Sequence, residues 1–146
     1  MAEPMDNGAP LRALYSAINK KDAEAFDQFM DEKVEFIDFG LGETLKGREA
    51  VKKYFKNWWT AFPEGSGEIK SMIVSGDQVI IEVTGRGKQT GPFELQQGRL
   101  EPSNQELEFG FAKICRVKDG KIVSIHGYSN AYRVLTTASK SRKLAA

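Results

Sequence analysis

The 146-residue sequence predicts an α+β domain in which helices precede a mostly antiparallel sheet. Up to Phe62, apolar residues recur at helical intervals of three and four, which is typical of amphipathic helices. From Gly67 onward, apolar and polar residues alternate, which is typical of half-buried strands. Asp119-Gly120 joins two of these alternating runs and is the strongest hairpin signal in the chain.

Two short helices are expected at the start of the fold. Pro10 suits the first turn of the first helix, and Asp22 is a typical N-cap for the second. A strand follows from Val34, and a long helix runs from Gly47 to Phe62, where a proline ends it. The apolar positions at helical spacing are Leu11, Leu14, Tyr15 and Ile18, then Phe26, Phe29 and Met30, and finally Val51, Tyr54, Phe55, Trp58 and Phe62.

The second half of the chain is predicted to be sheet. Strands are expected at residues 69–74, 79–84, 107–117 and 122–130, joined pairwise by hairpin turns. Residues 85–91 are glycine-rich and basic, but no helix follows them and the spacing of a phosphate-binding loop is absent, which excludes nucleotide binding there. Residues 96–104 are expected to form a turn.

Composition narrows the class of protein. With 21 basic and 20 acidic residues the net charge is +1, so nothing favours a nucleic-acid partner. No apolar run is long enough to span a bilayer, and the single cysteine excludes an internal disulfide, so we expect a cytoplasmic protein without a membrane partner. The single histidine rules out a His-based metal cluster, and we expect neither a metal nor a cofactor.

One domain is expected, because a chain of this length can bury one good core but not two. We place it at residues 10–135. The small and polar residues 1–9 are expected to form a mobile leader, and residues 136–146 a basic disordered tail.

Two ionisable residues interrupt apolar strand faces. Strand alternation places Asp38 on the same face as Phe36, and Lys113 on the same face as Phe111. A carboxylate against apolar surface has a raised pKa, which suits a general acid or base. The alternative is that Asp38 only caps the turn at residues 40–46.

Three further residues have simple interpretations. By parity His126 faces away from the apolar side of its strand, so a surface or interface position is expected unless a bulge turns it inward. Trp59 lies beside the apolar stripe of the long helix, where it either lines a cavity mouth or packs at the edge. Cys115 is expected to be a small core residue.

The order of these elements, together with several segments, resembles a known superfamily. The segments are NKKDAEAF at residues 19–26, VEFID at 34–38, LKGREAVKKYF at 45–55, QTGPF at 89–93 and FAKICRVKDGKIVSIHGY at 111–128. They resemble the SnoaL-like polyketide cyclases and the ketosteroid-isomerase-like proteins, which share the fold of nuclear transport factor 2. The resemblance covers residues 11–135. It implies a cone in which a curved, mixed, mostly antiparallel sheet packs around the long helix and two short N-terminal helices close the wide end.

The resemblance also implies a pocket chemistry. Asp38 matches the aspartate that transfers the proton in ketosteroid isomerases. The two oxyanion donors of those isomerases, a tyrosine and a protonated aspartate, are replaced by Leu14 and Lys113. The histidine that SnoaL-like cyclases often carry before a Thr-Gly pair is replaced by Gln89.

Three functions remain open at this point. The first is an isomerase- or cyclase-type enzyme on a hydrophobic carbonyl compound, in which Asp38 transfers the proton, Lys113 stabilises the enolate oxygen, and both reach one cavity. The second is ligand binding without chemistry, and the third is an interaction domain. We also expect a homodimer through the outer face of the sheet. The expected substrate-binding residues are Tyr15, Phe36, Phe55, Trp58, Phe109 and Phe111.

Overall fold

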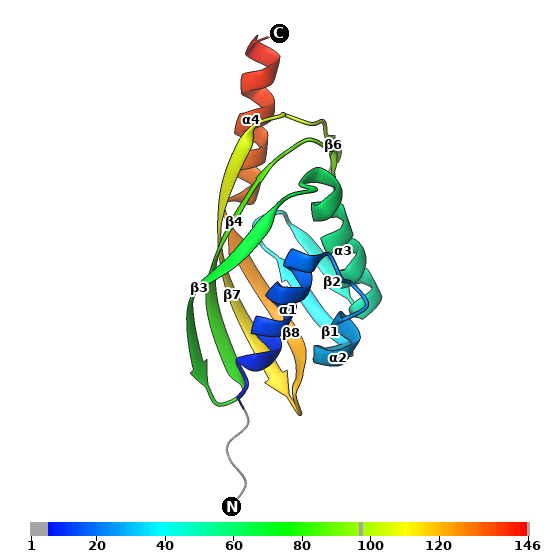
Figure 1. Cartoon of the computed structure of the whole chain (residues 1–146), viewed down its shortest axis with the longest axis vertical. Helices are drawn as coiled ribbons and strands as arrows, with labels where there is room; N and C mark the ends of the chain where they lie inside the picture. The colour runs from blue at the N-terminus through cyan, green and yellow to red at the C-terminus, as the bar shows by residue number, and fades with distance from the viewer. Residues whose placement is uncertain (1–5, 97, 146) are drawn as a thin grey trace, which may run out of the picture.

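The computed structural model describes residues 6–96 and 98–145 and has the predicted α+β architecture. A curved sheet lies on one side, and α1 and α3 pack against its inner face (Figure 1). The helices are α1 (Ala9–Lys20), α2 (Phe26–Phe29), α3 (Arg48–Ala61) and α4 (Ala131–Ala145). The strands are β1 (Met30–Asp38), β2 (Glu43–Lys46), β3 (Ser66–Ser75), β4 (Gln78–Lys88), β5 (Phe93–Leu95), β6 (Gly98–Leu100), β7 (Glu106–Lys118) and β8 (Lys121–Ser129).

The main sheet has the strand order β2-β1-β8-β7-β4-β3. The β1 and β8 strands pair in parallel, and the other neighbours pair antiparallel, so the sheet is mixed and mostly antiparallel as expected. The β5 and β6 strands form a separate small ribbon, which places a strand inside the segment 96–104 that was predicted to be a turn. The β1–β8 pairing brings the end of the predicted Asp38 strand beside the last strand, at the centre of the fold.

The sequence signal for the first helix is confirmed, since Pro10 lies in the first turn of α1. Asp22 was predicted to be the N-cap of the second helix, but the N-cap of α2 is Ala25, and the Asp22 carboxylate instead accepts a hydrogen bond from the Ala25 amide at 3.2 Å in the turn before α2. The short α2 is joined to α3 by ion pairs, since Asp27 lies 3.0 Å from Arg48 and 2.7 Å from Lys52. Aromatic rings then fill the space between helices and sheet.

Both chain ends differ from expectation where the structure describes them. Residues 1–5 lie outside the described part, but residues 6–9 form a turn and the start of α1, and the Asn7 side chain donates a hydrogen bond to the Gly76 carbonyl at 2.8 Å. The predicted disordered tail is instead part of α4, up to Ala145. Ala131, Leu135 and Ala138 are buried at helical spacing, so a short apolar stripe anchors this otherwise basic and polar segment.

Candidate functional site

Asp38 ends β1 on the inner face of the sheet and is 5% exposed. Its Oδ1 accepts a hydrogen bond from the Leu41 amide at 2.9 Å, so the turn cap that the sequence left open is present. Its Oδ2 accepts a hydrogen bond from the Tyr54 hydroxyl at 2.6 Å. Both carboxylate oxygens therefore have partners within the protein.

Tyr54 belongs to α3, and its phenol is enclosed by the core. Burial, followed by the negative charge of Asp38, holds the pKa of Tyr54 well above its ordinary value. Glu43 of β2 pairs with Asp38 in the strand ladder and is also buried. Burial and then the Asp38 charge raise the pKa of Glu43. The inner end of the site is therefore a carboxylate pair capped by a protonated tyrosine.

Lys113 of β7 lies on the same sheet row as Asp38, with Gly127 of β8 between them. A Cβ at Gly127 would lie 3.8 and 3.9 Å from Cγ and Cε of Lys113, so the lysine side chain lies across the glycine. The two charged residues are separated by two strand spacings, roughly 10 Å between their Cα atoms. They do not form an ion pair, because the salt bridges of the described lysines involve other residues.

The Lys113 ammonium is held by aromatic rings. The residue is 5% exposed, and its Nζ lies 5.4 to 5.5 Å from the ring centroids of Tyr15, Phe36, Phe55 and Phe111. Such contacts attract a cation through the ring quadrupole. Among the side chains that the structure describes, none forms an ion pair with this ammonium or accepts a hydrogen bond from it. Within the described part of the chain, its positive charge therefore has no carboxylate in direct contact.

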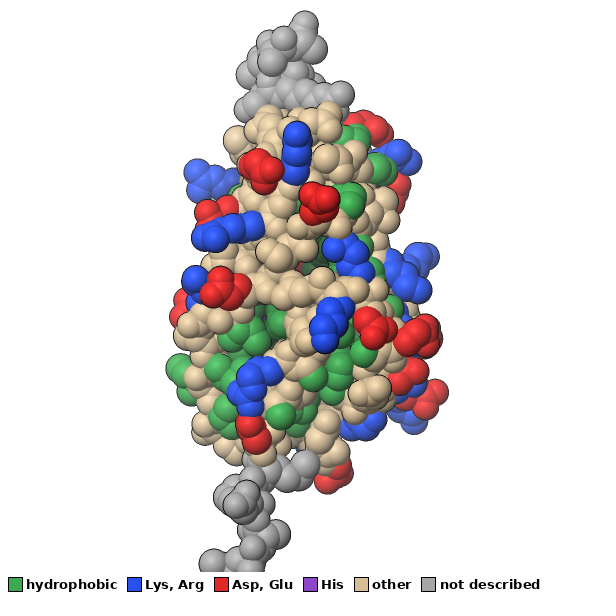
Figure 2. Space-filling model, in the orientation of Figure 1, with side chains coloured by type: hydrophobic (Ala, Val, Ile, Leu, Met, Phe, Trp, Pro, Cys, Tyr) green, Lys and Arg blue, Asp and Glu red, His purple; other side chains and the backbone are tan. Residues whose placement is uncertain are grey.

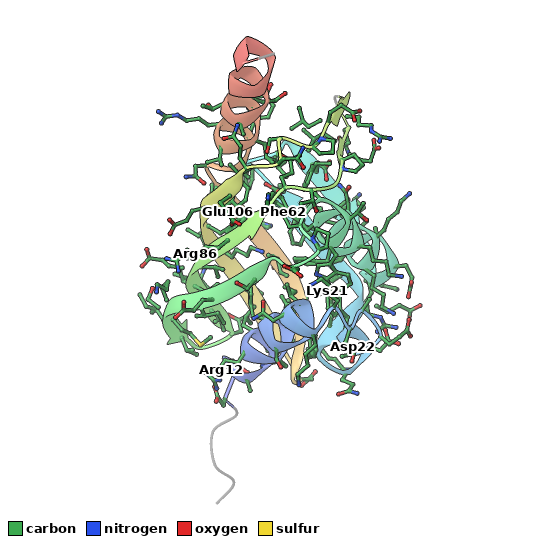
Figure 3. The ribbon with its side chains drawn as sticks, turned by 45° about the horizontal axis from the view of Figure 1, so that its top comes forward. Arg12, Lys21, Asp22, Phe62, Arg86 and Glu106 are labelled. Carbon is green, nitrogen blue, oxygen red and sulfur yellow. The ribbon has the colours of Figure 1, made fainter. Side chains whose placement is uncertain are left out.

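A pocket of about 80 Å³ opens beside this ammonium. It lies between α1, α3 and the sheet, and hydrophobic side chains gather on the face of the molecule that carries α1 and β3 (Figure 2). Phe62, at the end of α3, and Arg86, on β4, belong to the lining (Figure 3). The complete lining is Tyr15, Ile18, Tyr54, Phe55, Trp58, Trp59, Phe62, Gly65, Ser66, Gly67, Val83, Gly85, Arg86, Phe109, Phe111 and Lys113.

The structure brings most of the sequence-predicted residues to one place. The aromatic candidates on α1, α3 and β7, together with Lys113, line the pocket. Phe36 does not line it but lies behind the lysine, against the ammonium. Asp38 is also absent from the lining, so the expectation that both charges reach one cavity is wrong as stated. Tyr54 spans the gap, because it lines the pocket and donates a hydrogen bond to Asp38.

Other candidates lie elsewhere. His126 packs edge-on against Phe39 at 6.2 Å, and Phe39 stacks on the exposed Tyr128, so His126 belongs to the outer face of the sheet. Cys115 is fully buried, and burial raises its pKa to about 12, which removes it as a nucleophile at neutral pH. Trp59 lines the pocket, and its indole N–H is buried without a hydrogen-bond partner among the described residues.

Sequence reasoning missed the roles of Tyr54, Glu43 and Gly127. Tyr54 was identified only as a core position, although it faces the carboxylate as well as the pocket. Glu43 could have been found by pairing the strands on either side of the Gly-rich turn, which sets it opposite Asp38. Gly127 lies between the two ionisable groups only because β1 pairs in parallel with β8, and the sequence does not reveal that pairing.

Within residues 6–96 and 98–145, no group of three or more His, Cys, Asp or Glu side chains could hold a metal ion. None of the described helices is both long enough and apolar enough to cross a membrane.

Comparison with known proteins agrees with this architecture. A family model described as SnoaL-like domain matches residues 11–125. The chain belongs to the SnoaL-like family. None of the curated proteins matches it. The family includes polyketide cyclases and isomerase-like proteins of this fold.

Solved structures give the same fold at low sequence identity. A candidate SnoaL-like polyketide cyclase from Jannaschia sp. CCS1 is 17% identical, with a TM-score of 0.80 over 95% of this chain and 98% of its own. The candidate polyketide cyclase IdmH from Streptomyces antibioticus is 19% identical, with a TM-score of 0.76 over 92% of this chain and 98% of its own. A protein with a ketosteroid isomerase-like fold from Catenulispora acidiphila, solved with trimethylamine, is 19% identical, with a TM-score of 0.73 over 88% of this chain and 91% of its own. At these identities the likeness shows the fold alone.

Proposed function

We propose that this SnoaL-like protein binds a hydrophobic carbonyl compound in the aromatic pocket and catalyses isomerase- or cyclase-type proton transfer on it. The observation that carries the proposal is the Lys113 ammonium, which is buried among four rings beside the pocket without a carboxylate partner in the described part of the chain. A fold keeps a buried, uncompensated charge at a cost of several kcal/mol. Such a group is most simply explained by a function.

Lys113 serves this reaction by holding the carbonyl oxygen. When a proton leaves the carbon next to a carbonyl, negative charge develops on the oxygen. A fixed cation in a dry pocket stabilises that developing charge far better than one in water, and such donors contribute about 3–4 kcal/mol in well-studied sites. Because no carboxylate of the described residues forms an ion pair with Lys113, its charge is available to the enolate.

Tyr54 and Asp38 form the proposed proton path. The carbon–hydrogen bond breaks as its proton moves to the Tyr54 oxygen, while the hydroxyl proton of Tyr54 moves along the 2.6 Å hydrogen bond to Asp38. The electron pair of the broken bond passes to the carbonyl oxygen at Lys113. The reverse sequence returns a proton to the enolate, at the same carbon or at a conjugated one. Tyr54 is neutral before and after, which agrees with its raised pKa beside the Asp38 carboxylate.

The proposal is tested by exchange of the α-protons of phenylacetone in D₂O, followed by proton NMR. Wild-type protein is expected to accelerate the exchange. Tyr54→Phe and Asp38→Asn should each remove the acceleration while ligand binding persists. The control is Lys53→Met, which removes a solvent-exposed lysine from the opposite side of α3 and should leave the rate unchanged. Exchange that is equally fast in Tyr54→Phe would contradict the proton path.

Ligand binding without chemistry is the second candidate. It is favoured by the two hydrogen bonds that already occupy the Asp38 oxygens and by the absence of Asp38 from the pocket lining. In that case Lys113 is a binding residue only. Phenylacetone would then bind, but its α-protons would exchange at the rate seen in buffer.

A further inference from the structure

The charges of the pocket are all of one sign. Its lining contains two charged side chains, Lys113 inside and Arg86 on β4, and no aspartate or glutamate of the described residues takes part. Arg86 is already paired with Glu108 at 3.2 Å, and both side chains are 62% exposed, so this pair is screened by solvent. Lys113 is the charge that a bound molecule would meet in a dry environment, and it favours an oxyanion.

The pocket is also small. Its volume of about 80 Å³ is well below the roughly 150 Å³ of an apolar cavity that holds benzene. A ligand can therefore place one ring beside Lys113 only if part of that ring extends through the open side. A fused system of several rings would leave most of its surface outside the pocket.

Glycines on β3 and β4 lie close to the aromatic rings beside the pocket. A Cβ at Gly67 would lie 3.2 Å from the Tyr15 ring, and a Cβ at Gly85 would lie 3.0 Å from the Phe111 ring. Both distances are shorter than ordinary contact, so any side chain larger than hydrogen at these positions would press on rings that surround Lys113. The two glycines belong to the β3–β4 and β4–β7 ladders, which hold this wall of the pocket in place.

From these observations we propose that the ligand is a single-ring compound whose oxyanion, an enolate or a carboxylate, lies on the Lys113 ammonium. This assignment rests on the proposed function only in taking the pocket as the substrate site. It goes further by excluding large multi-ring substrates and by requiring a negative charge. A charge-assisted hydrogen bond of this kind is typically worth about 1.5–3 kcal/mol, or roughly 10- to 100-fold in affinity.

The test is isothermal titration calorimetry with matched probe pairs. Cyclohexane-1,3-dione, which is an enolate at neutral pH, is compared with its neutral 3-methoxy enone. Benzoate is compared with benzamide. In each pair the two rings are alike and the charge differs, and the two pairs separate enolate from carboxylate ligands. Wild-type protein should bind at least one charged probe about tenfold more tightly than its neutral partner.

Two variants assign the preference to Lys113. Lys113→Met should abolish it, Lys113→Arg should retain it, and Lys53→Met should leave it as in wild type. Circular dichroism and the denaturation midpoint show whether each variant is folded, and if Lys113→Met is not, Lys113→Gln, which also removes the charge, takes its place. Equal binding of charged and neutral probes by wild type would overturn the proposal.

Ring number is tested with 5-phenylcyclohexane-1,3-dione and 2-naphthoate, which add a second ring to each charged probe. Both should bind at least about tenfold more weakly than the single-ring probe. Tighter binding of the larger probes would overturn the size limit. Because these titrations measure affinity, they can succeed while phenylacetone exchange fails, and the two proposals therefore fail separately.

Discussion

Lys113→Met is expected to stabilise the fold. Lys113 is 5% exposed, and its ammonium has no carboxylate partner in the described structure, so burial of the charge costs several kcal/mol. Four ring contacts at 5.4 to 5.5 Å lie near the outer limit for cation–π attraction and offset only part of this cost. Methionine has a similar length and packs well against rings. We therefore expect a gain of about 1–3 kcal/mol in the free energy of unfolding.

Differential scanning calorimetry and urea denaturation at pH 7 measure this gain. At this chain length about 1 kcal/mol corresponds to roughly 2–4 °C in Tm, so the expected rise is about 3–9 °C. Lys53→Met, on the exposed side of α3, is the matched control and should change stability by less than about 0.5 kcal/mol. A loss of more than about 1 kcal/mol in Lys113→Met would mean that the ammonium makes a stabilising bond within the fold. Its charge would then not be available to a ligand.

Three further predictions follow from the same geometry. Tyr54→Phe removes the 2.6 Å hydrogen bond to the buried Asp38 and should cost about 1.5–3 kcal/mol in urea denaturation, whereas an unchanged midpoint would show that the bond does not form. The pKa of Glu43 is raised in the folded protein from 4.5, so its protonated form favours folding, and this contribution is complete below pH 4.5 and lost as the pH rises. Glu43→Gln should therefore match wild type at pH 4 and exceed its stability at pH 7, and an equal difference at both pH values would refute this. A homodimer through the outer aromatic cluster of Phe39, His126 and Tyr128 should give a light-scattering mass near twice 16.3 kDa. Tyr128→Lys should lower this mass toward that of the monomer, and a monomeric mass of the wild-type protein at all micromolar concentrations would exclude the dimer.

The elements of the fold could be predicted because each has a strong local signal. The long helix around Phe55 has an apolar stripe at helical spacing, and the hairpin at Asp119-Gly120 has a turn pair that requires a left-handed backbone, with φ of 51° and 75°. The tail was misjudged because three buried positions over eight residues, Ala131 to Ala138, are a weak signal within a basic segment. Two of those three are alanines, whose burial leaves little trace in a hydrophobic pattern.

The site could be predicted only in part because strand parity gives a face but not the neighbours on it. Parity placed Asp38 and Lys113 inward, and both are buried. It could not show that Gly127 lies between them or that Tyr54 reaches Asp38 from α3, since both contacts depend on the parallel pairing of β1 with β8 and on the position of the helix. Because the two charges are separated, Lys113→Met breaks no ion pair with Asp38, and a gain of stability is expected.

A crystal structure of the protein with cyclohexane-1,3-dione tests the central claim most directly. The account predicts the ring in the pocket between α1, α3 and the sheet, with one enolate oxygen about 2.7–2.9 Å from Nζ of Lys113. It also predicts that the hydrogen bond from Tyr54 to Asp38 is retained behind the ligand. A complex in which the dione lies outside this pocket, or in which Lys113 turns away to pair with Asp38, would contradict the account.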